Sequence, residues 1–470
     1  MKKRFVAMFL SVVMVICMLP TSIFATNIVA SGYYEGESDS TDVVWRLGSD
    51  ATSPILANGE PLFIQSIPVQ NTVPDDFIGV YTIEDLYNIR NDPTQNYILM
   101  EDLDLSEILW EPIGTVDDPF IGTFDGNGHT IYNMTIETAK LDLSSKYIGL
   151  FGYCTGIIKN LCVNNGMIFT ENHYDYVGSI AGYANSIENC SSGCYINAKC
   201  YMGGGIAGEV IKITNCYFFG ALDCELERNQ SDYYELSYLG GICGYASKIS
   251  KCINIGQVKG DVTTVIDAYS MAGGIAGVSR DIEECCNVGN VDFSGGGYKT
   301  HISAGGICGG SPTGSDHIEN SYNIGNITVS NKAYSGAVGG ILGGAYGDYS
   351  FESCYNLGTL KNESKYRHDW YIGAIAGLGD VYLKYCYKDD LYPFAGDGNV
   401  SSNVYIHANS TTINRTSFSI SENFIGFDFN NVWELESYMD PPQLKVFHHI
   451  LYPEKEIVNN TTYTHFGQYN

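Results

Sequence analysis

Three pairs of adjacent aspartates are the first groups in this sequence that could do chemistry: Asp75-Asp76, Asp117-Asp118 and Asp389-Asp390. A glycoside hydrolase needs two carboxyl groups at a fixed separation, one as the acid and one as the base or nucleophile. Adjacent residues on a strand point to opposite faces, so no pair provides this arrangement by itself. A polysaccharide lyase would add a basic residue beside calcium-binding carboxylates. With 25 Lys and Arg against 53 Asp and Glu, no basic cluster recurs along the chain.

One segment, Asp125-Gly126-Asn127-Gly128-His129, has oxygen ligands of the kind that calcium prefers. It lacks the further spaced carboxylates of a calcium loop, and Asp-Gly-Asn-Gly is typical of a tight turn between strands. The nine histidines are dispersed and show no zinc-like spacing with cysteine. We therefore expect no cofactor, and calcium stays an option without support in the sequence.

Tyrosine, with 36 copies, is the residue type best suited to binding in this chain. Its ring is rigid and amphipathic, and it can stack on a sugar or pack against a protein partner. The high β-propensity of tyrosine would also explain many of these residues. If a ligand surface exists, we expect it in two loops that contain the residues Tyr233, Tyr234, Tyr238, His368, Trp370 and Tyr371.

These side chains must be positioned by a repeat. A Gly-Gly-Ile-small-Gly block recurs every 26 to 36 residues, and its closing glycines are Gly152, Gly182, Gly208, Gly244, Gly277, Gly309, Gly343 and Gly377. An Ile-x-x-Cys block and a Gly-x-aliphatic block follow in most units, and the residues between them alternate apolar and polar. This period of two predicts short strands, not helices. Units that cannot bury their apolar faces alone are expected to stack into a solenoid of parallel sheets.

The fixed positions of the repeat are interpreted as structural. The glycines from Gly182 to Gly377 would serve stacked corners, where the backbone needs a positive φ or approaches more closely than a Cβ permits. The cysteines of the Ile-x-x-Cys blocks would form a buried ladder: Cys190, Cys216, Cys252, Cys285, Cys354 and Cys386. Free cysteine is a small hydrophobe that is often buried, and Ser321 fills the same slot in one unit. The distance between rungs does not exclude disulfides, but we favour free thiols.

Two units, GGIAGEVIKITNCYFFGAL (204–222) and GGICGYASKISKCINIGQV (240–258), resemble the GLUG repeat of bacterial surface and secreted proteins. The segment FIGTFDGNGHTIYNMTI (120–136) is similar to the lead-in of such repeats, and the likeness extends over about residues 80–447. The resemblance implies a right-handed parallel β-helix or closely related β-solenoid, all-β, with about eight visible coils. It also implies an exported protein, often linked to adhesion or extracellular matrix, without a shared catalytic constellation.

The chain is predicted to have five segments. Residues 1–25 begin with three basic residues and continue with an apolar run, which is the layout of a secretory signal peptide. Residues 26–74 are expected to be an arm or linker. Residues 75–146 would form the N-terminal cap and first coils, with a capping box from Thr82 to Asp85 that starts a short helix over the N-terminal opening. Residues 147–390 are the repeats, and residues 391–470 a C-terminal cap and tail plugged by Trp433, Leu444 and Phe447.

The net charge of −28 limits the partners. Nucleic acid and anionic membranes would be repelled, whereas a neutral glycan or a host or matrix protein would not. No second apolar run could span a bilayer once the signal is removed. We therefore predict an extracellular, non-catalytic scaffold for adhesion or ligand binding that displays acidic, Tyr-rich loops; its oligomeric state is open. The alternatives are a carbohydrate-active enzyme of the parallel β-helix type and a purely structural envelope component.

Overall fold

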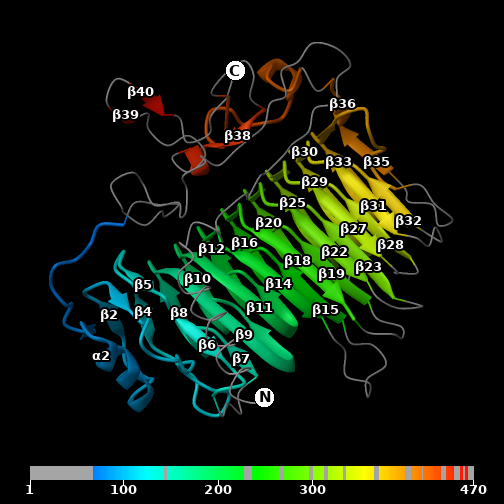
Figure 1. Cartoon of the computed structure of the whole chain (residues 1–470). Helices are drawn as coiled ribbons and strands as arrows, with labels where there is room; N and C mark the ends of the chain where they lie inside the picture. Colours follow the sequence, from blue (N-terminus) through cyan, green and yellow to red (C-terminus); the bar gives the residue numbers. More distant parts are fainter. Residues whose placement is uncertain are drawn as a thin grey trace.

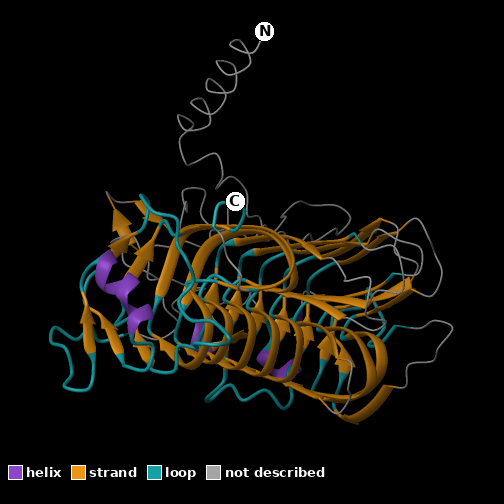
Figure 2. Ribbon diagram, turned by 90° about the horizontal axis from the view of Figure 1, so that it is seen from below, coloured by secondary structure: helices purple, strands orange, loops and turns teal. Residues whose placement is uncertain are grey.

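The structure is a computed structural model that describes residues 67–141, 146–226, 236–263, 269–295, 300–311, 316–331, 335–364, 370–396, 404–414, 417–435, 441–448, 456–458 and 461–463. Its strands run in parallel from coil to coil around one long axis (Figures 1 and 2). The predicted fold class, an all-β parallel solenoid, is thereby confirmed.

One wall of the solenoid, the main sheet, has 13 strands. They are β1 (Ile78–Val80), β2 (Tyr97–Leu99), β4 (Thr123–Asp125), β8 (Phe151–Lys159), β10 (Ala181–Glu188), β12 (Ala207–Thr214), β16 (Cys243–Ser250), β20 (Ala276–Glu283), β24 (Cys308–Ser311), β25 (Asp316–Glu319), β29 (Leu342–Glu352), β33 (Ala376–Lys384) and β35 (Val404–Ala408). The closing glycines of the eight sequence units fall on successive rungs of this wall, from β8 to β33. The repeat seen in the sequence is therefore the structural coil.

Three further stacks of parallel strands complete each coil. The short-strand stack is β13 (Tyr217–Phe218), β17 (Ile253–Asn254), β21 (Cys286–Asn287), β26 (Tyr322–Asn323), β30 (Tyr355–Asn356), β34 (Tyr387–Lys388) and β36 (Thr411–Thr412). The middle stack is β14 (Ala221–Leu226), β18 (Gln257–Val262), β22 (Val291–Gly295), β27 (Ile327–Asn331) and β31 (Leu360–Ser364). The last stack is β15 (Leu236–Gly240), β19 (Tyr269–Gly273), β23 (His301–Gly305), β28 (Ser335–Gly339) and β32 (Trp370–Gly373).

In the first coils these stacks are continuous with long strands. The strands β9 (Cys162–Val177) and β11 (Ser191–Gly204) each pass through the positions of all three stacks. Before them come β3 (Leu103–Asp104), β5 (Thr130–Tyr132), β6 (Thr135–Glu137) and β7 (Tyr147–Ile148), which pair in the same parallel sense.

The strands that flank the links from the middle stack to the last stack are in register from coil to coil. Most residues of these links fall outside the described residues. Tyr233, Tyr234 and His368, which were predicted to belong to a ligand surface, lie in these links, and the structure therefore does not place them.

Positive φ occurs at the corner where the chain leaves the main sheet. The residues in this conformation precede the cysteine slot: Asn189, Asn215, Lys251, Glu284, Asn320, Ser353 and Tyr385, with φ from 45° to 55°. None of the glycines from Gly182 to Gly377 has a positive φ. Close approach is the reason for glycine there, since a Cβ at Gly277 would lie 2.6 Å from the amide nitrogen of Leu239 and 2.7 Å from the carbonyl oxygen of Gly244.

The cysteine slots lie in the interior. All 14 cysteines of the described residues are buried and free, among them Cys190, Cys216, Cys252, Cys285, Cys354 and Cys386. The thiol of Cys216 donates to the carbonyl of Thr214 at 3.3 Å, and the hydroxyl of Ser321 donates to the carbonyl of Glu319 at 2.8 Å. Serine can replace cysteine in this slot because either group satisfies the carbonyl two residues earlier. Burial raises the pKa of Cys154 and Cys162 to about 12, which suppresses the reactive thiolate.

A ladder of buried asparagine side chains also runs through the interior, in a slot that the sequence analysis did not single out. The Nδ2 of Asn254 donates to the Oδ1 of Asn287, that of Asn287 to Asn323, and that of Asn323 to Asn356, at 2.7–2.8 Å. Each Nδ2 also donates to the carbonyl of the glycine two residues later. Both amide hydrogens of Asn254, Asn287 and Asn323 are thus used, as burial of a polar side chain requires.

A short helix closes the N-terminal end, as predicted. In α2 (Ile83–Asn88) the Thr82 hydroxyl accepts from the Asp85 amide, and the Asp85 carboxylate accepts from the Thr82 amide, which confirms the capping box. Leu86, and Ile89 in the following turn η2 (Ile89–Asn91), are fully buried in the core. No helix in the described part of the chain has the length and apolar character needed to cross a bilayer.

After β36 the chain folds back along the outside of the short-strand stack (Figure 1). This C-terminal segment, residues 413–447, contains η4 (Ser421–Asn423), the antiparallel pair β37 (Trp433–Glu434) and β38 (Gln443–Leu444), and η5 (Lys445–Phe447). Trp433, Leu444 and Phe447 are fully buried, but against the side of the solenoid and not in its end opening. A hairpin, β39 (Glu456–Val458) and β40 (Thr461–Tyr463), follows.

Candidate ligand-binding surface

Seven tyrosines gather on the outside of the corner where each coil enters the main sheet, and we call this surface the tyrosine corner: Tyr147, Tyr153, Tyr176, Tyr183, Tyr201, Tyr238 and Tyr245. Two facing columns of residues form most of it. One column is Tyr147, Tyr176, Met202, Tyr238 and Met271 in register. The other, on the main sheet, is Tyr153, Tyr183, Glu209, Tyr245 and Val278.

Tyrosine rings stack on one another within each column, and rings of the two columns also contact each other. The centroids of Tyr153 and Tyr183 are 4.4 Å apart with an interplanar angle of 11°, and those of Tyr147 and Tyr176 are 4.7 Å apart at 23°. Tyr147 also meets Tyr153 edge-on at 4.9 Å. All four side chains are half-buried. Burial raises the pKa of Tyr147 and Tyr183, so the phenols stay neutral hydrogen-bonding groups.

The repeat glycines make this corner tight. A Cβ at Gly182 would lie 2.6 Å from the amide nitrogen of Ile148, and a Cβ at Gly208 2.7 Å from that of Val177. Ile148 and Val177 directly follow the tyrosines of the first column. The backbone of the main sheet therefore packs directly against the strand that bears these tyrosines, which brings the two columns face to face.

The composition of the corner changes along the axis. Met202, Tyr238, Met271 and Val278 form a small buried cluster in its middle. In the next two coils the same positions are small: Ser303 and Ala337 in the first column, and Gly310 and Gly344 in the second. Aromatic residues therefore occupy both columns only in the N-terminal coils, and the first column becomes aromatic again at Tyr371.

Glu209 lies in the middle of the aromatic part, in register with Tyr183 on one side and Tyr245 on the other. Its side chain is half-buried, and this burial raises the pKa of its carboxyl group. Within the described residues Glu209 has no hydrogen bond and no ion pair, in contrast to most carboxylates of the main sheet. Glu209 is thus a half-buried carboxylate beside aromatic rings, without a charge-neutralising partner among the described residues.

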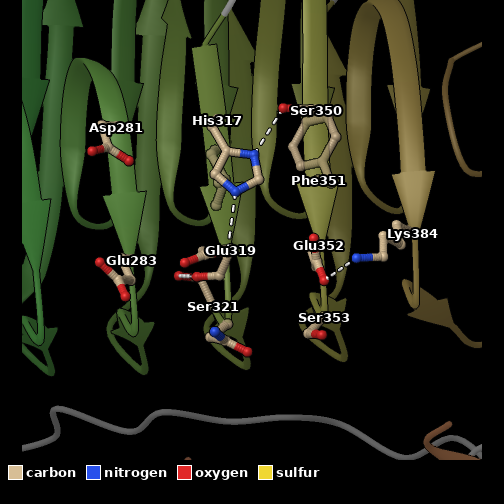
Figure 3. Close-up of polar contacts among 12 residues, drawn as sticks. Asp281, Glu283, His317, Glu319, Ser321, Ser350, Phe351, Glu352, Ser353 and Lys384 are labelled. Atoms are coloured by element: carbon tan, nitrogen blue, oxygen red, sulfur yellow. Dashed lines mark hydrogen bonds and ion pairs between the residues drawn. The ribbon is translucent and has the colours of Figure 1, made fainter. Parts of the chain in front are cut away.

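A row of carboxylates lies at the other end of the main-sheet strands (Figure 3). Glu283, Glu319 and Glu352 are in register on neighbouring rungs, which places them about 4.8 Å apart per rung. Adjacent-coil carboxylates therefore do converge here, unlike the sequence-adjacent aspartate pairs.

These glutamates have partners within the sheet. The Nε2 of His317 lies 3.2 Å from Glu319, and its Nδ1 lies 2.8 Å from the hydroxyl of Ser350. Lys384 contacts Glu352 at 2.6 Å, and Lys248 lies 3.9 Å from Glu283. The row is thus a set of half-exposed ion pairs, which contribute little to stability individually.

The predicted ligand residues that the structure describes are separated. Tyr238 belongs to the tyrosine corner and is 6% exposed. Tyr371 occupies the equivalent position four rungs later and is 5% exposed. Trp370, its neighbour in sequence, is only partly buried and packs against the interior core. The structure therefore joins Tyr238 to other tyrosines that the sequence analysis did not select.

A sequence signal for the corner does exist. Its second column consists of the residue directly after each closing glycine, as in Gly152-Tyr153, Gly182-Tyr183 and Gly244-Tyr245. This position is aromatic in three of the first four units and glycine in two later ones, which distinguishes it from the uniform positions of the repeat.

The Asp125 segment forms a turn between β4 and β5, as the sequence favoured. The Oδ1 of Asp125 accepts from the amide of Asn127 and from the side chain of Asn160, both at 2.9 Å, and Lys159 lies 3.3 Å from its Oδ2. The carboxylate is therefore already occupied by protein donors. In the described part of the chain, no group of three or more His, Cys, Asp or Glu residues is arranged to hold a metal ion.

Comparisons with known proteins give partial matches. No family model matches the chain. Halomucin of Haloquadratum walsbyi is 31% identical over 154 residues, which are 30% of this chain and 2% of halomucin. The "Putative Gly-rich membrane protein" of Evansella cellulosilytica is 33% identical over 113 residues, which are 22% of this chain and 13% of that protein. The matched segments are thus a small part of the length of these curated relatives.

Two solved structures are also similar. That of a "putative immunoglobulin A1 protease" from Bacteroides ovatus has a TM-score of 0.37 and 17% identity, covering 80% of this chain and 94% of the other. A structure named "IgA1 Protease" has a TM-score of 0.32 and 16% identity, covering 57% of this chain and 21% of the other. The assignment of the fold rests on the strand pairing of the present chain.

Proposed function

We propose that this protein is an exported, non-catalytic scaffold of the GLUG-repeat kind that binds an extracellular glycan or matrix protein. The N-terminal layout of a signal peptide supports export, and the names of the two sequence relatives, a mucin and a membrane protein, agree with a location at or outside the cell surface. The acidic charge disfavours polyanionic ligands.

The observation that carries the proposal is the tyrosine corner. Its half-buried rings stand outside the core, on a backbone held rigid by stacked glycines and parallel pairing. Rigid aromatic side chains bind ligands at a low entropic cost because few torsions are frozen on binding.

The test is a screen of the mature protein against a glycan array and immobilised matrix proteins. We expect at least one ligand whose binding falls at least tenfold when Tyr153 and Tyr183 are both replaced by serine, with an unchanged far-UV circular dichroism spectrum. Binding that is instead lost on replacement of Tyr233 and Tyr234 would move the site to the link. No ligand in either screen would favour the purely structural alternative.

A carbohydrate-active enzyme is the second candidate. It is favoured by the raised pKa of Glu209, which suits a general acid, and by the register of Glu283, Glu319 and Glu352 on adjacent rungs. The check is the release of new reducing ends or unsaturated ends from a panel of polysaccharides. The scaffold proposal expects no release; release that is abolished by Glu209→Gln or Glu319→Gln would replace it.

A further inference from the structure

The protein itself shows how an outward column of tyrosines can be covered. Tyr322, Tyr355 and Tyr387 point away from the core in the short-strand stack, and the C-terminal segment lies over them. The hydroxyl of Tyr355 donates to the carbonyl of Pro442, and that of Tyr387 donates to the carbonyl of Ile425 at 2.8 Å. Trp433 packs on the rings of Tyr322 and Tyr355. An extended polypeptide thus satisfies such a column with main-chain carbonyls and apolar side chains.

The tyrosine corner presents the same residue type without the same degree of burial. Tyr322 is 0% and Tyr355 is 0% exposed, whereas Tyr153 and Tyr183 remain half-buried and stack on each other. Tyr153 and Tyr183 lie on consecutive rungs and Tyr245 lies two rungs further along, so these half-buried rings and Glu209 form a strip parallel to the axis of the solenoid. A strip of this shape fits an extended chain.

The charge of the strip comes from Glu209. Tyr147 on β7 and Tyr183 on β10 interact electrostatically with Glu209, and Tyr245 on β16 lies in register with it on the next rung. Lys212, further along β12, is directed to Glu188 at 3.7 Å. Among the described residues no cation is therefore paired with the Glu209 carboxylate, although the site holds a potential ion-pair acceptor framed by aromatic rings.

We propose that the tyrosine corner binds an extended segment of a protein partner and that Glu209, framed by Tyr183 and Tyr245, receives a lysine or arginine side chain of that segment. A basic side chain would supply the charge-assisted hydrogen bond that Glu209 lacks, and the neighbouring rings would add a cation–π contribution. A neutral glycan offers neither. The chain's net charge of −28 attracts a basic partner at long range as well.

This inference rests on the proposed function and narrows its ligand class from glycan or protein to protein. A natural probe follows from the C-terminal segment, which covers tyrosines with Pro441, Pro442 and Gln443. We would use the acetylated, amidated pentapeptide Gly-Pro-Pro-Lys-Leu and the same peptide with its lysine acetylated at Nζ. Binding is measured by the chemical shifts of ¹³C-labelled tyrosine rings in the mature protein.

The charged peptide is expected to bind at least tenfold more tightly than the acetylated peptide, and the preference is expected to weaken as salt is added. The variant Glu209→Gln should remove this preference. The matched control is Glu188→Gln, which makes the same change of charge on the same sheet and should leave the preference intact. Circular dichroism verifies that both variants are folded.

Equal binding of the two peptides, or a preference that survives Glu209→Gln, would overturn the inference. So would a glycan ligand that depends on Tyr153 and Tyr183 and is displaced by neither peptide, although this result would leave the proposed scaffold function standing. If no glycan, matrix protein or peptide binds, the proposed function and this inference both fail.

Discussion

The two outward-facing tyrosine columns of this solenoid differ in how far they are buried. The column of Tyr322, Tyr355 and Tyr387 is fully covered by the protein's own C-terminal segment, whereas all rings of the tyrosine corner except that of Tyr238 are only half-buried. The covered column has no carboxylate at its centre, and the corner has Glu209. The covered column contributes to stability, whereas the tyrosine corner is the surface that we propose binds a partner. Four substitutions test this distinction.

The largest effect is expected from Trp433→Ala. Trp433 is fully buried between the C-terminal segment and the covered column, and loss of a buried tryptophan costs about 3–5 kcal/mol. The segment should detach and expose Tyr322 and Tyr355. Limited proteolysis should then cut the segment much faster than in the parent protein while the coils persist. Ile425→Ala, in the same segment but at a residue that is 56% exposed, should not change the cutting rate.

Gly277→Ala should disturb the packing of the main-sheet backbone against the strand that bears Tyr238. A Cβ there would meet the backbone of Leu239 and Gly244 at 2.6–2.7 Å, and the Cβ of Tyr238 at 2.7 Å. We expect a loss of about 1–3 kcal/mol in the free energy of unfolding, measured by denaturant titration. Gly344→Ala is the matched control, because its Cβ would approach only the Ser303 hydroxyl at 3.0 Å and other side-chain atoms beyond that distance. Equal losses would show that the corner is not the tight point of the coil.

Removal of single hydroxyl groups compares the columns directly. Tyr355→Phe deletes a donor to the carbonyl of Pro442 and leaves that buried oxygen without it, so we expect a loss of about 1 kcal/mol. Tyr153→Phe, in the tyrosine corner, should change the unfolding free energy by less than half as much. Both values come from the same urea titration. A larger loss at Tyr153 would indicate that the corner, too, is held by internal hydrogen bonds.

The smallest effect on stability is expected from Glu209→Gln, and it depends on pH. Burial raises the pKa of Glu209 above its ordinary value of 4.5, so the folded protein holds this proton to a higher pH than the unfolded chain does. The ionised carboxylate therefore lowers stability as the pH rises through the raised pKa. The variant should melt at a higher temperature than the parent at neutral pH, and at the same temperature below about pH 4. A lower melting temperature at neutral pH would reveal a stabilising partner of Glu209.

Much of the architecture could be predicted from the sequence, because each coil is encoded by one repeat unit of neighbouring residues. The closing glycines fix the rungs of the main sheet, and Thr82 with Asp85 fixes the start of α2. The reason for glycine was only half right, since positive φ is carried by residues such as Asn215 and Lys251 one position before the cysteine slot. The sequence could not distinguish the two, because both a left-handed corner and a close approach favour small or permissive residues.

The candidate site was harder to predict, for a physical reason. Tyr153 and Tyr183 are brought beside Tyr147 and Tyr176 by stacking of coils, and the contact depends on how sharply the backbone turns between two strands. The alternation of apolar and polar residues along a strand predicts which face of the sheet each side chain occupies. It does not predict the angle between that sheet and the next one. The path of the C-terminal segment was unpredictable for a similar reason, since Trp433 and Leu444 fit an end plug and a side cover equally well by composition.

The asparagine ladder of the interior has a direction. Asn254, Asn287 and Asn323 each give one hydrogen to their own turn and one to the asparagine of the next coil, and the ladder ends at Asn356. In the coil after Asn356 the slot holds Lys388, whose ammonium instead donates to the carbonyl of Asp389 at 2.8 Å. The coil before Asn254 holds Phe218 in this slot, so the units from Asn254 to Asn356 share a contact that neither flanking coil has. Within this part of the solenoid, a whole coil could be added or removed without redesign of the ladder.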